Sequence, residues 1–128
     1  MELTYKAMQK MDKGFICTNV QETDLAGHSQ STTEYKKILE IADIGLKKIV
    51  DELTDDDVLV VMADHGNDPK IGSSRHTREC VPLLIKHGNK KGINVGIRKS
   101  LSDVGATVCD YFGVESTENG DSFLDLIK

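Results

Sequence analysis

The stretch VLVVMADHGNDP, from Val58 to Pro69, decides how this sequence is interpreted. Its first half is continuously apolar, which is typical of a central strand that is covered on both faces. Where that strand ends, Asp64 and His65 place a carboxylate and an imidazole side by side. Because ligands gather beyond the carboxyl ends of strands in open α/β sheets, this junction marks a candidate functional site.

Helices and strands are predicted to alternate along the chain. Helices are expected at 2–13 (stopped by Gly14), from Ser31 or Thr32 onward, from Ser102 or Asp103 to Phe112, and as a turn at 122–128. Strands are expected at 15–20, 58–63, 81–86 and, as a short one, 94–98, with a polar loop at 21–30. No helix is predicted between Ala63 and Val81, so the flanking strands should be antiparallel, because a parallel neighbour needs a crossover connection. The pattern predicts an α/β protein with a mixed sheet.

Composition and charge argue against several classes of protein. The chain has 128 residues, the size of one ordinary domain, and a formal net charge of -5, which disfavours a nucleic-acid partner. No apolar run approaches the ~18 residues of a membrane span, and the N-terminus lacks the apolar stretch of a signal peptide. Cys17, Cys80 and Cys109 show no CxxC spacing, so we expect reduced, mostly buried thiols in a cytoplasmic protein.

Acidic and histidine side chains follow the ends of two predicted strands. The residues concerned are Asp24 and His28 after the first strand, Asp64 and His65 at the end of the second, and His76 in the loop that leaves it. Carboxylate oxygen with neutral imidazole is a ligand set for Zn, Mn or Fe, without the thiolates of a structural zinc site. The remaining histidine, His87, has no partner in this pattern and is expected on the surface. The sequence therefore predicts a divalent metal site at one edge of the sheet.

Each of these features alone has a simpler explanation. Asp24 and His28 could belong to an ordinary polar loop, and the Asp64 carboxylate could accept backbone N–H groups at the strand end. Gly27 and Gly66 could let the backbone bend closely around an ion, or they could be turn residues. The metal hypothesis depends on the joint occurrence of these features in the appropriate loops.

Three segments, TDLAGH, ADHGND and HTRE, resemble in this order the metal-binding segments of the alkaline phosphatase superfamily. The joined DHGNDP and HTRE segments and the later SDVGATVCDYFG are most similar to the phosphopentomutase family, whereas the four-residue spacing from Asp24 to His28 is similar to cofactor-independent phosphoglycerate mutases. The resemblance covers Phe15 to Phe123. It implies an alkaline-phosphatase-like three-layer α/β/α sandwich with a mixed, mostly parallel sheet, of which this chain would form part.

The resemblance also implies a centre of two divalent ions, manganese or zinc. Asp24, His28 and His76 would hold one ion, and Asp64 and His65 would belong to the other.

Three neighbouring residues would assist this centre. Asn67 and Asp68 would orient the metal ligands. Arg78 would either contact the phosphate bidentately or pair structurally with Glu79 or Asp68.

The activity implied is transfer of a phosphoryl group between two hydroxyls of one sugar, of the ribose 1-phosphate to ribose 5-phosphate type, through a phosphorylated Thr or Ser. No residue of this chain matches that nucleophile or the further carboxylate ligand of the family. No segment matches the cap domain that recognises the sugar phosphate. Residues 1–128 are therefore expected to form a single partial domain, the C-terminal part of the catalytic core, which lacks an N-terminal half. Such a chain should bind about one ion rather than two.

By itself the chain is expected to be inactive, to expose apolar surface and to self-associate. A phosphoglycerate mutase or phosphodiesterase of the same superfamily, or a non-catalytic metal-binding module, is the alternative.

Overall fold

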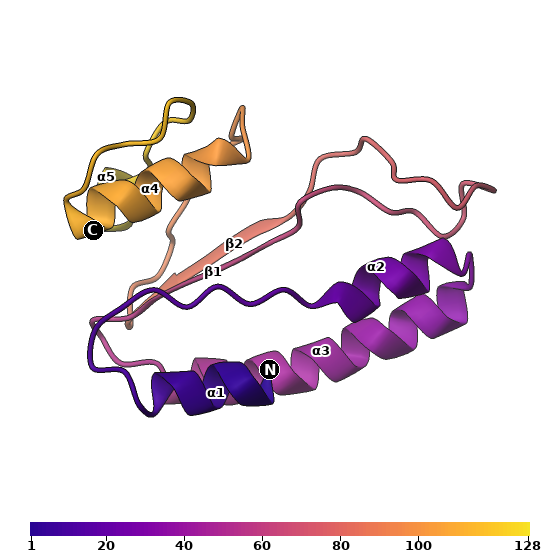
Figure 1. Ribbon diagram of the computed structural model, residues 1–128, viewed down its shortest axis with the longest axis horizontal. Coiled ribbons are helices and arrows are strands. Elements are labelled where there is room, and N and C mark those ends of the chain that lie inside the picture. Colours follow the sequence, from indigo (N-terminus) through magenta and orange to yellow (C-terminus); the bar gives the residue numbers. More distant parts are fainter. The chain divides into compact units, whose positions relative to one another are not determined.

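The computed structural model describes the whole chain, residues 1–128. Its elements, in order, are α1 (Glu2–Met8), α2 (Gln21–His28), α3 (Thr32–Glu52), β1 (Val58–Met62), β2 (Leu83–His87), α4 (Ser102–Phe112) and α5 (Leu124–Ile127) (Figure 1). They belong to two units: the first unit comprises residues 1–53 and 65–82, and the second unit comprises residues 54–64 and 83–128. None of the helices combines the length and apolar character that crossing a lipid bilayer requires.

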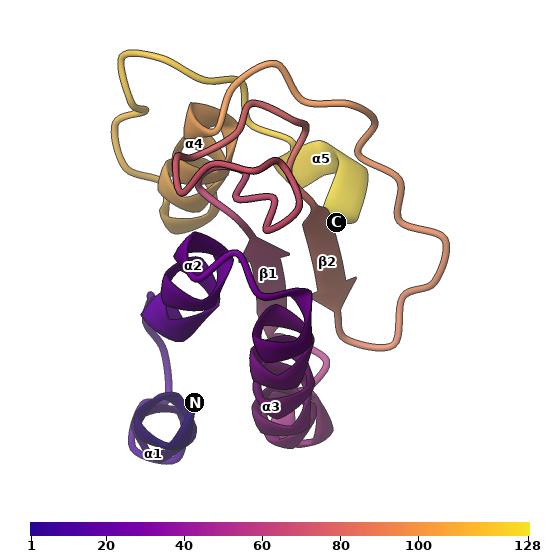
Figure 2. The same cartoon turned by 90° about the vertical axis from the view of Figure 1, so that its right-hand side faces the viewer.

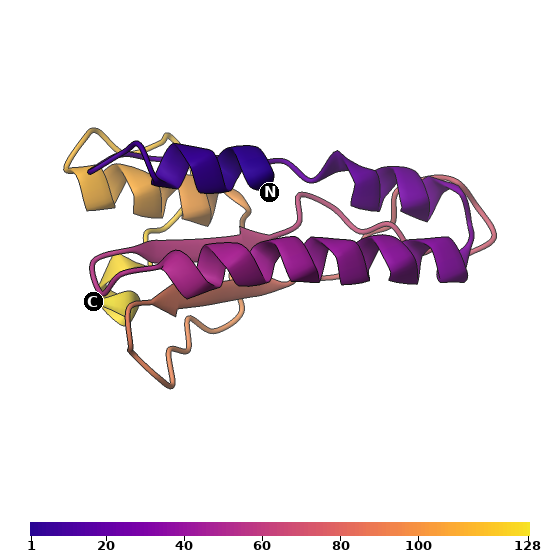
Figure 3. The same ribbon diagram turned by 90° about the horizontal axis from the view of Figure 1, so that it is seen from below.

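The first unit is built on the long helix α3. The Ser31 hydroxyl accepts a hydrogen bond from the Glu34 backbone N–H (3.2 Å), which confirms the predicted N-terminus of this helix. The helices α1 and α2 lie in succession along α3 (Figures 1 and 3). Both helices pack on α3, so the first unit buries one side of it.

Three expectations for this unit are wrong. The segment predicted as a polar loop forms α2, because Glu22 and Asp24 stabilise the positive end of the helix and α2 packs on α3. Residues 15–20 form no strand: no neighbouring strand pairs with them, and the Phe15 side chain is 59% exposed. The helix α1 also ends at Met8, earlier than predicted.

The sheet of the second unit consists of β1 and β2. They run antiparallel (Figure 2), as the missing crossover helix predicts. Val58 lies opposite His87, and Met62 lies opposite Leu83. The protein is thus of the α/β type, but a mostly parallel sheet in a three-layer sandwich is not confirmed. The short strand predicted at residues 94–98 does not form, since Gly96 takes a left-handed conformation (φ 66°) that interrupts extended backbone.

The core of the second unit lies around the predicted C-terminal turn, which is confirmed as α5. The side chains of Phe123, Leu124 and Ile127 are at most 4% exposed. Apolar side chains from both strands, from α4 and from the segment between β2 and α4 pack on this group: Val58, Leu83, Ile85, Ile93, Val95 and Val104. His87 is not the surface residue expected, because its Nδ1 lies 2.6 Å from the Ile127 carbonyl oxygen and ties β2 to α5.

A buried carboxylate fastens the C-terminal segment to α4. Asp103, 3% exposed, accepts hydrogen bonds from the Asp121 backbone N–H (2.9 Å) and from Arg98 Nε (2.8 Å). The Asp121 N–H is the largest influence on the pKa of the Asp103 carboxyl; burial opposes it and Arg98 reinforces it, so this pKa lies below its ordinary value. Ionised Asp103 therefore holds the chain on the approach to the buried Phe123.

The three thiols are free, which agrees with the expected reduced state. The expectation that they are mostly buried is wrong: Cys17 and Cys80 are exposed, and Cys109 is half-buried.

Candidate metal centre

The helix α2 supplies two of the predicted ligands. Asp24 and His28 are four residues apart, so the helix brings their side chains to the same face. The distance between His28 Nε2 and Asp24 Oδ2 is 3.3 Å. The two side chains thus meet because this segment is helical, and not because it is a loop as predicted.

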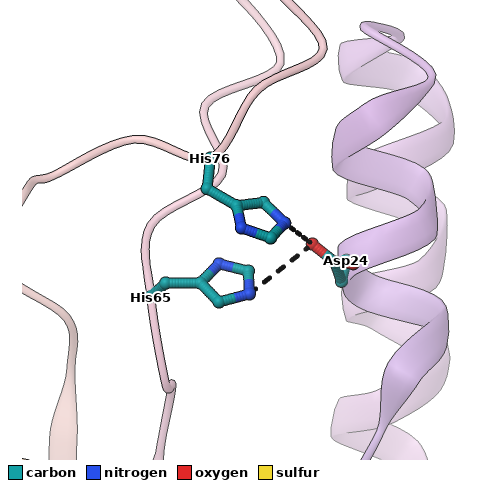
Figure 4. A group of neighbouring side chains, drawn as sticks. All are labelled: Asp24, His65 and His76. Carbon is teal, nitrogen blue, oxygen red and sulfur yellow. Dashed lines mark ion pairs between the residues drawn. The ribbon is translucent and has the colours of Figure 1, made fainter.

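The loop at residues 65–82 supplies two more imidazoles. An antiparallel bridge between Gly66 and Thr77, with the Thr77 N–H donating to the Gly66 carbonyl oxygen (2.9 Å), holds the two arms of this loop together. Beside it, the rings of His65 and His76 stack with their centroids 3.6 Å apart. Both rings point toward Asp24 on α2 (Figure 4), and the distances to Asp24 Oδ1 are 3.3 Å from His76 Nε2 and 4.0 Å from His65 Nε2.

We refer to Asp24, His28, His65 and His76 as the histidine cluster. One ligand atom each from Asp24, His65 and His76 lie within 4.8 Å of one another. His28 Nε2 lies 3.2 Å from His76 Nε2. All four side chains keep between 30% and 49% of their surface exposed, so an ion can reach the cluster from solvent.

The hydrogen bonds of two rings orient their free nitrogens. His28 Nδ1 lies 2.7 Å from the Ser74 carbonyl oxygen, and His65 Nδ1 lies 3.1 Å from the Gly66 carbonyl oxygen. Because a carbonyl oxygen only accepts, each Nδ1 carries the proton and donates it. In the neutral rings the Nε2 lone pairs are therefore available, as in metal-binding histidines held by a backbone carbonyl. The sequence gives no signal for the Ser74 contact, because a backbone carbonyl is common to every residue.

The donor atoms of the cluster fit a divalent cation. Burial is the largest influence on the Asp24 carboxyl and raises its pKa, but the hydrogen bond from Asn67 and the charges of His28, His76 and His65 outweigh it, so this pKa is lowered. When the rings are neutral, the Nε2 lone pairs of His28 and His65 and the Asp24 carboxylate are all acceptors, an arrangement that a cation would satisfy. Oxygen and imidazole nitrogen suit Mn and Zn alike, so the set does not distinguish these metals.

The other predicted site residues occupy different places. Asn67 donates a hydrogen bond to the Asp24 carboxylate, and Asp68 accepts one from the Lys70 backbone N–H, so Asp68 is engaged with its own loop. Arg78 is exposed and pairs with neither Glu79 nor Asp68. That observation leaves Arg78 available to a ligand.

The ligands predicted for the second ion, Asp64 and His65, fall in different units. Asp64 belongs to the second unit and is exposed. Its role as a ligand of a second ion stays a prediction. His65 lies with Asp24 and His76, although the resemblance assigns it to the other ion.

The two glycines of the site are not required by a left-handed backbone conformation. Neither Gly27 nor Gly66 has a positive φ, and both are buried. A Cβ at Gly66 would lie 2.3 Å from the Glu79 carboxylate, so Gly66 leaves room for that side chain. Glu79 in turn accepts a hydrogen bond from the Thr77 hydroxyl (2.6 Å) beside the bridge.

Comparison with known proteins gives the family. The family model described as the Metalloenzyme superfamily matches residues 1–116. The chain belongs to this superfamily. Among curated proteins it is 41% identical to a phosphopentomutase of Alkaliphilus oremlandii over 97% of this chain and 32% of the relative. It is 41% identical to the phosphopentomutase of Clostridioides difficile (94% and 31%) and 46% identical to that of Thermotoga petrophila (88% and 29%).

The chain therefore spans about a third of the length of the curated relatives it matches. A metal-dependent function agrees both with the family and with the histidine cluster.

Proposed function

We propose that this chain is the C-terminal metal-binding part of a phosphopentomutase-like enzyme. The whole enzyme would move a phosphoryl group between two hydroxyls of a sugar, of the ribose 1-phosphate to ribose 5-phosphate type. The observation that carries the proposal is the histidine cluster, which joins a helix and a loop distant in sequence around one carboxylate. The similarity to phosphopentomutases over nearly the whole chain supports the choice of reaction.

Asp24, His28 and His76 are the proposed ligands of one divalent ion. Asp64 and His65 are the proposed ligands of a second ion. This second assignment rests on the resemblance of the ADHGND segment to the metal-binding segments of the superfamily. Manganese is the proposed metal, with zinc as the alternative.

In this proposal the chain holds and orients the metal ions, and the reacting groups belong to the substrate and to the remaining part of the enzyme. Bound divalent ions would supply the positive charge that stabilises the entering and leaving oxygens of a phosphoryl group. The carbonyls of Ser74 and Gly66 keep the imidazole Nε2 atoms turned toward the cluster. Exposed Arg78 is proposed to contact the phosphate of the sugar substrate, since a guanidinium binds phosphate oxygens bidentately.

Titration calorimetry with Mn²⁺ and with Zn²⁺ tests the metal proposal. We expect about one strong site per chain, because only one ligand set is complete in the first unit. The variant His28→Ala should weaken binding strongly. His87→Gln is the matched control, since His87 is the one histidine outside the cluster and glutamine can still donate to the Ile127 carbonyl. No binding by the wild-type chain, or equal binding by His28→Ala, would contradict the proposal.

The isolated chain should not act as a mutase. Among its residues we assign no Thr or Ser nucleophile, and covalent phosphoryl transfer depends on one. The assay follows conversion of ribose 1-phosphate to ribose 5-phosphate by the Mn-loaded chain, alone and with the remaining part of a related phosphopentomutase added. Turnover by the chain alone near the typical enzyme value of about 10 per second would contradict the partial-domain proposal. No turnover in either mixture would favour a metal-binding module without catalysis.

We also propose that the missing part of such an enzyme covers the outer face of α3. Ile41 and Ile44 lie about 60° apart around the axis of this helix and are 54% and 66% exposed, so one side of α3 presents apolar side chains to solvent. In the isolated chain the same face is proposed to drive self-association.

A further inference from the structure

We infer that Asn67 is a positioning residue that fixes the Asp24 carboxylate for metal binding, and that position 27 must be glycine to leave room for Asn67. The inference rests on the proposed metal site. It assigns the site two residues that contact no ion themselves and whose effects on metal affinity should depend on each other.

Asn67 makes two hydrogen bonds to Asp24. Asn67 Nδ2 lies 2.7 Å from Asp24 Oδ1 and 3.1 Å from the Asp24 backbone carbonyl oxygen. Both partners are acceptors, so the amide must turn its NH₂ group toward them and its oxygen away. One side chain of the loop thus restrains both the backbone and the carboxylate of Asp24. The carboxylate oxygen that it holds, Oδ1, is also the one nearest to His76 and His65.

The cost of this orientation falls on the other end of the amide. Asn67 Oδ1 is buried and has no hydrogen-bond partner. A buried acceptor without a partner destabilises the folded state, so the placement of Asn67 is not the one that best satisfies its own polar atoms. What the placement does provide is the pair of hydrogen bonds to Asp24.

Gly27 forms the wall against which the amide rests. A Cβ at position 27 would lie 2.4 Å from Asn67 Cγ and 2.7 Å from both Nδ2 and Oδ1. Such distances are far below van der Waals contact, so any side chain at this position would push the amide away from Asp24. Since Gly27 lies within α2 and has no positive φ, its backbone does not require glycine. Space for Asn67 is therefore the reason for glycine here.

Binding of Mn²⁺ to the full chain, measured by calorimetry, tests the inference. Asn67→Ala and Gly27→Ala should each weaken binding about 10-fold to 100-fold, the usual loss when a group that orients a metal ligand is removed. Gly45→Ala is the matched control: Gly45 also lies within a helix, and a Cβ there would meet only the flexible Met1 side chain (2.6 and 2.8 Å). The Mn²⁺ affinity of this control variant should stay within about twofold of the wild type, because position 45 is not coupled to the metal site.

The double variant separates positioning from general damage. Once Asn67→Ala has emptied the space, Gly27→Ala should cost less than about twofold further affinity, because the two changes remove one interaction. Fully additive losses would overturn the steric link between Gly27 and Asn67. Unchanged Mn²⁺ affinity in Asn67→Ala, with only a lower melting temperature of the metal-free chain, would show that Asn67 stabilises the fold alone. That result would overturn the positioning role. Failure of the wild-type chain to bind Mn²⁺ or Zn²⁺ would instead refute the metal site itself, and the inference with it.

Discussion

Metal binding at the histidine cluster should raise the melting temperature of the chain, and Asp24→Asn should abolish that rise. A ligand that binds only the folded chain, at about 100 times its dissociation constant, adds about 2.7 kcal/mol to the free energy of unfolding. Unfolding entropy near the melting temperature is about 2.1 cal/mol/K per residue, which over this chain gives about 0.27 kcal/mol/K. The expected increase in melting temperature is the ratio of the two, about 10 °C.

The assay is a thermal melt followed by circular dichroism, with increasing Mn²⁺ and reversal by a chelator. Asp24→Asn preserves the size of the side chain but removes the charge that the imidazoles surround, so its melting temperature should not respond to Mn²⁺. Asp51→Asn is the matched control, because this carboxylate lies on α3 in an exposed pair with Lys47 (2.6 Å). A full Mn²⁺ response in Asp24→Asn, or its loss in Asp51→Asn, would refute the assignment of the metal to this cluster.

Three further outcomes test a helix cap, a buried carboxylate and the self-association of the chain. Ser31→Ala removes the side chain that accepts from the Glu34 N–H and should lower the free energy of unfolding by about 1 kcal/mol, measured by urea denaturation; an unchanged urea midpoint would contradict the capping role. The pKa of Asp103 is lowered in the folded chain, so its contribution to stability should be complete above the ordinary pKa of about 4 and lost as pH falls through the lower folded value. The urea midpoint of Asp103→Asn should therefore fall less steeply at low pH than that of the wild type. Ile44→Lys places a charge on a residue that is 66% exposed and should reduce self-association in light scattering; identical scattering would remove α3 from the proposed contact.

Local signals explain which parts of the fold could be predicted. The long helix was predicted because its capping serine and its apolar periodicity lie within the segment itself. Its neighbour α2 was missed because that helix is stabilised by packing on α3, which no short window of sequence contains. The antiparallel pairing was predicted because a loop without a helix leaves few alternatives.

The same distinction applies to the candidate site. Residue types in the expected loops predicted that Asp24, His28, Asp64, His65 and His76 would converge at one edge of the sheet, and the structure brings Asp24, His28, His65 and His76 together. The stacking of His65 on His76 could not be predicted, because the loop bridge that aligns the two rings forms between residues distant in sequence. The steric link between Gly27 and Asn67 depends on tertiary distances alone.

The four-residue spacing of Asp24 and His28 on α2 also limits how this segment can vary among related chains. Each added residue turns an α-helix by about 100°, so a single insertion between the two side chains would swing His28 well away from Asp24. Relatives with a different spacing must therefore break or bulge the helix at this turn, or take the imidazole from another position. The length of one helical turn thus sets the separation of the two side chains at this site.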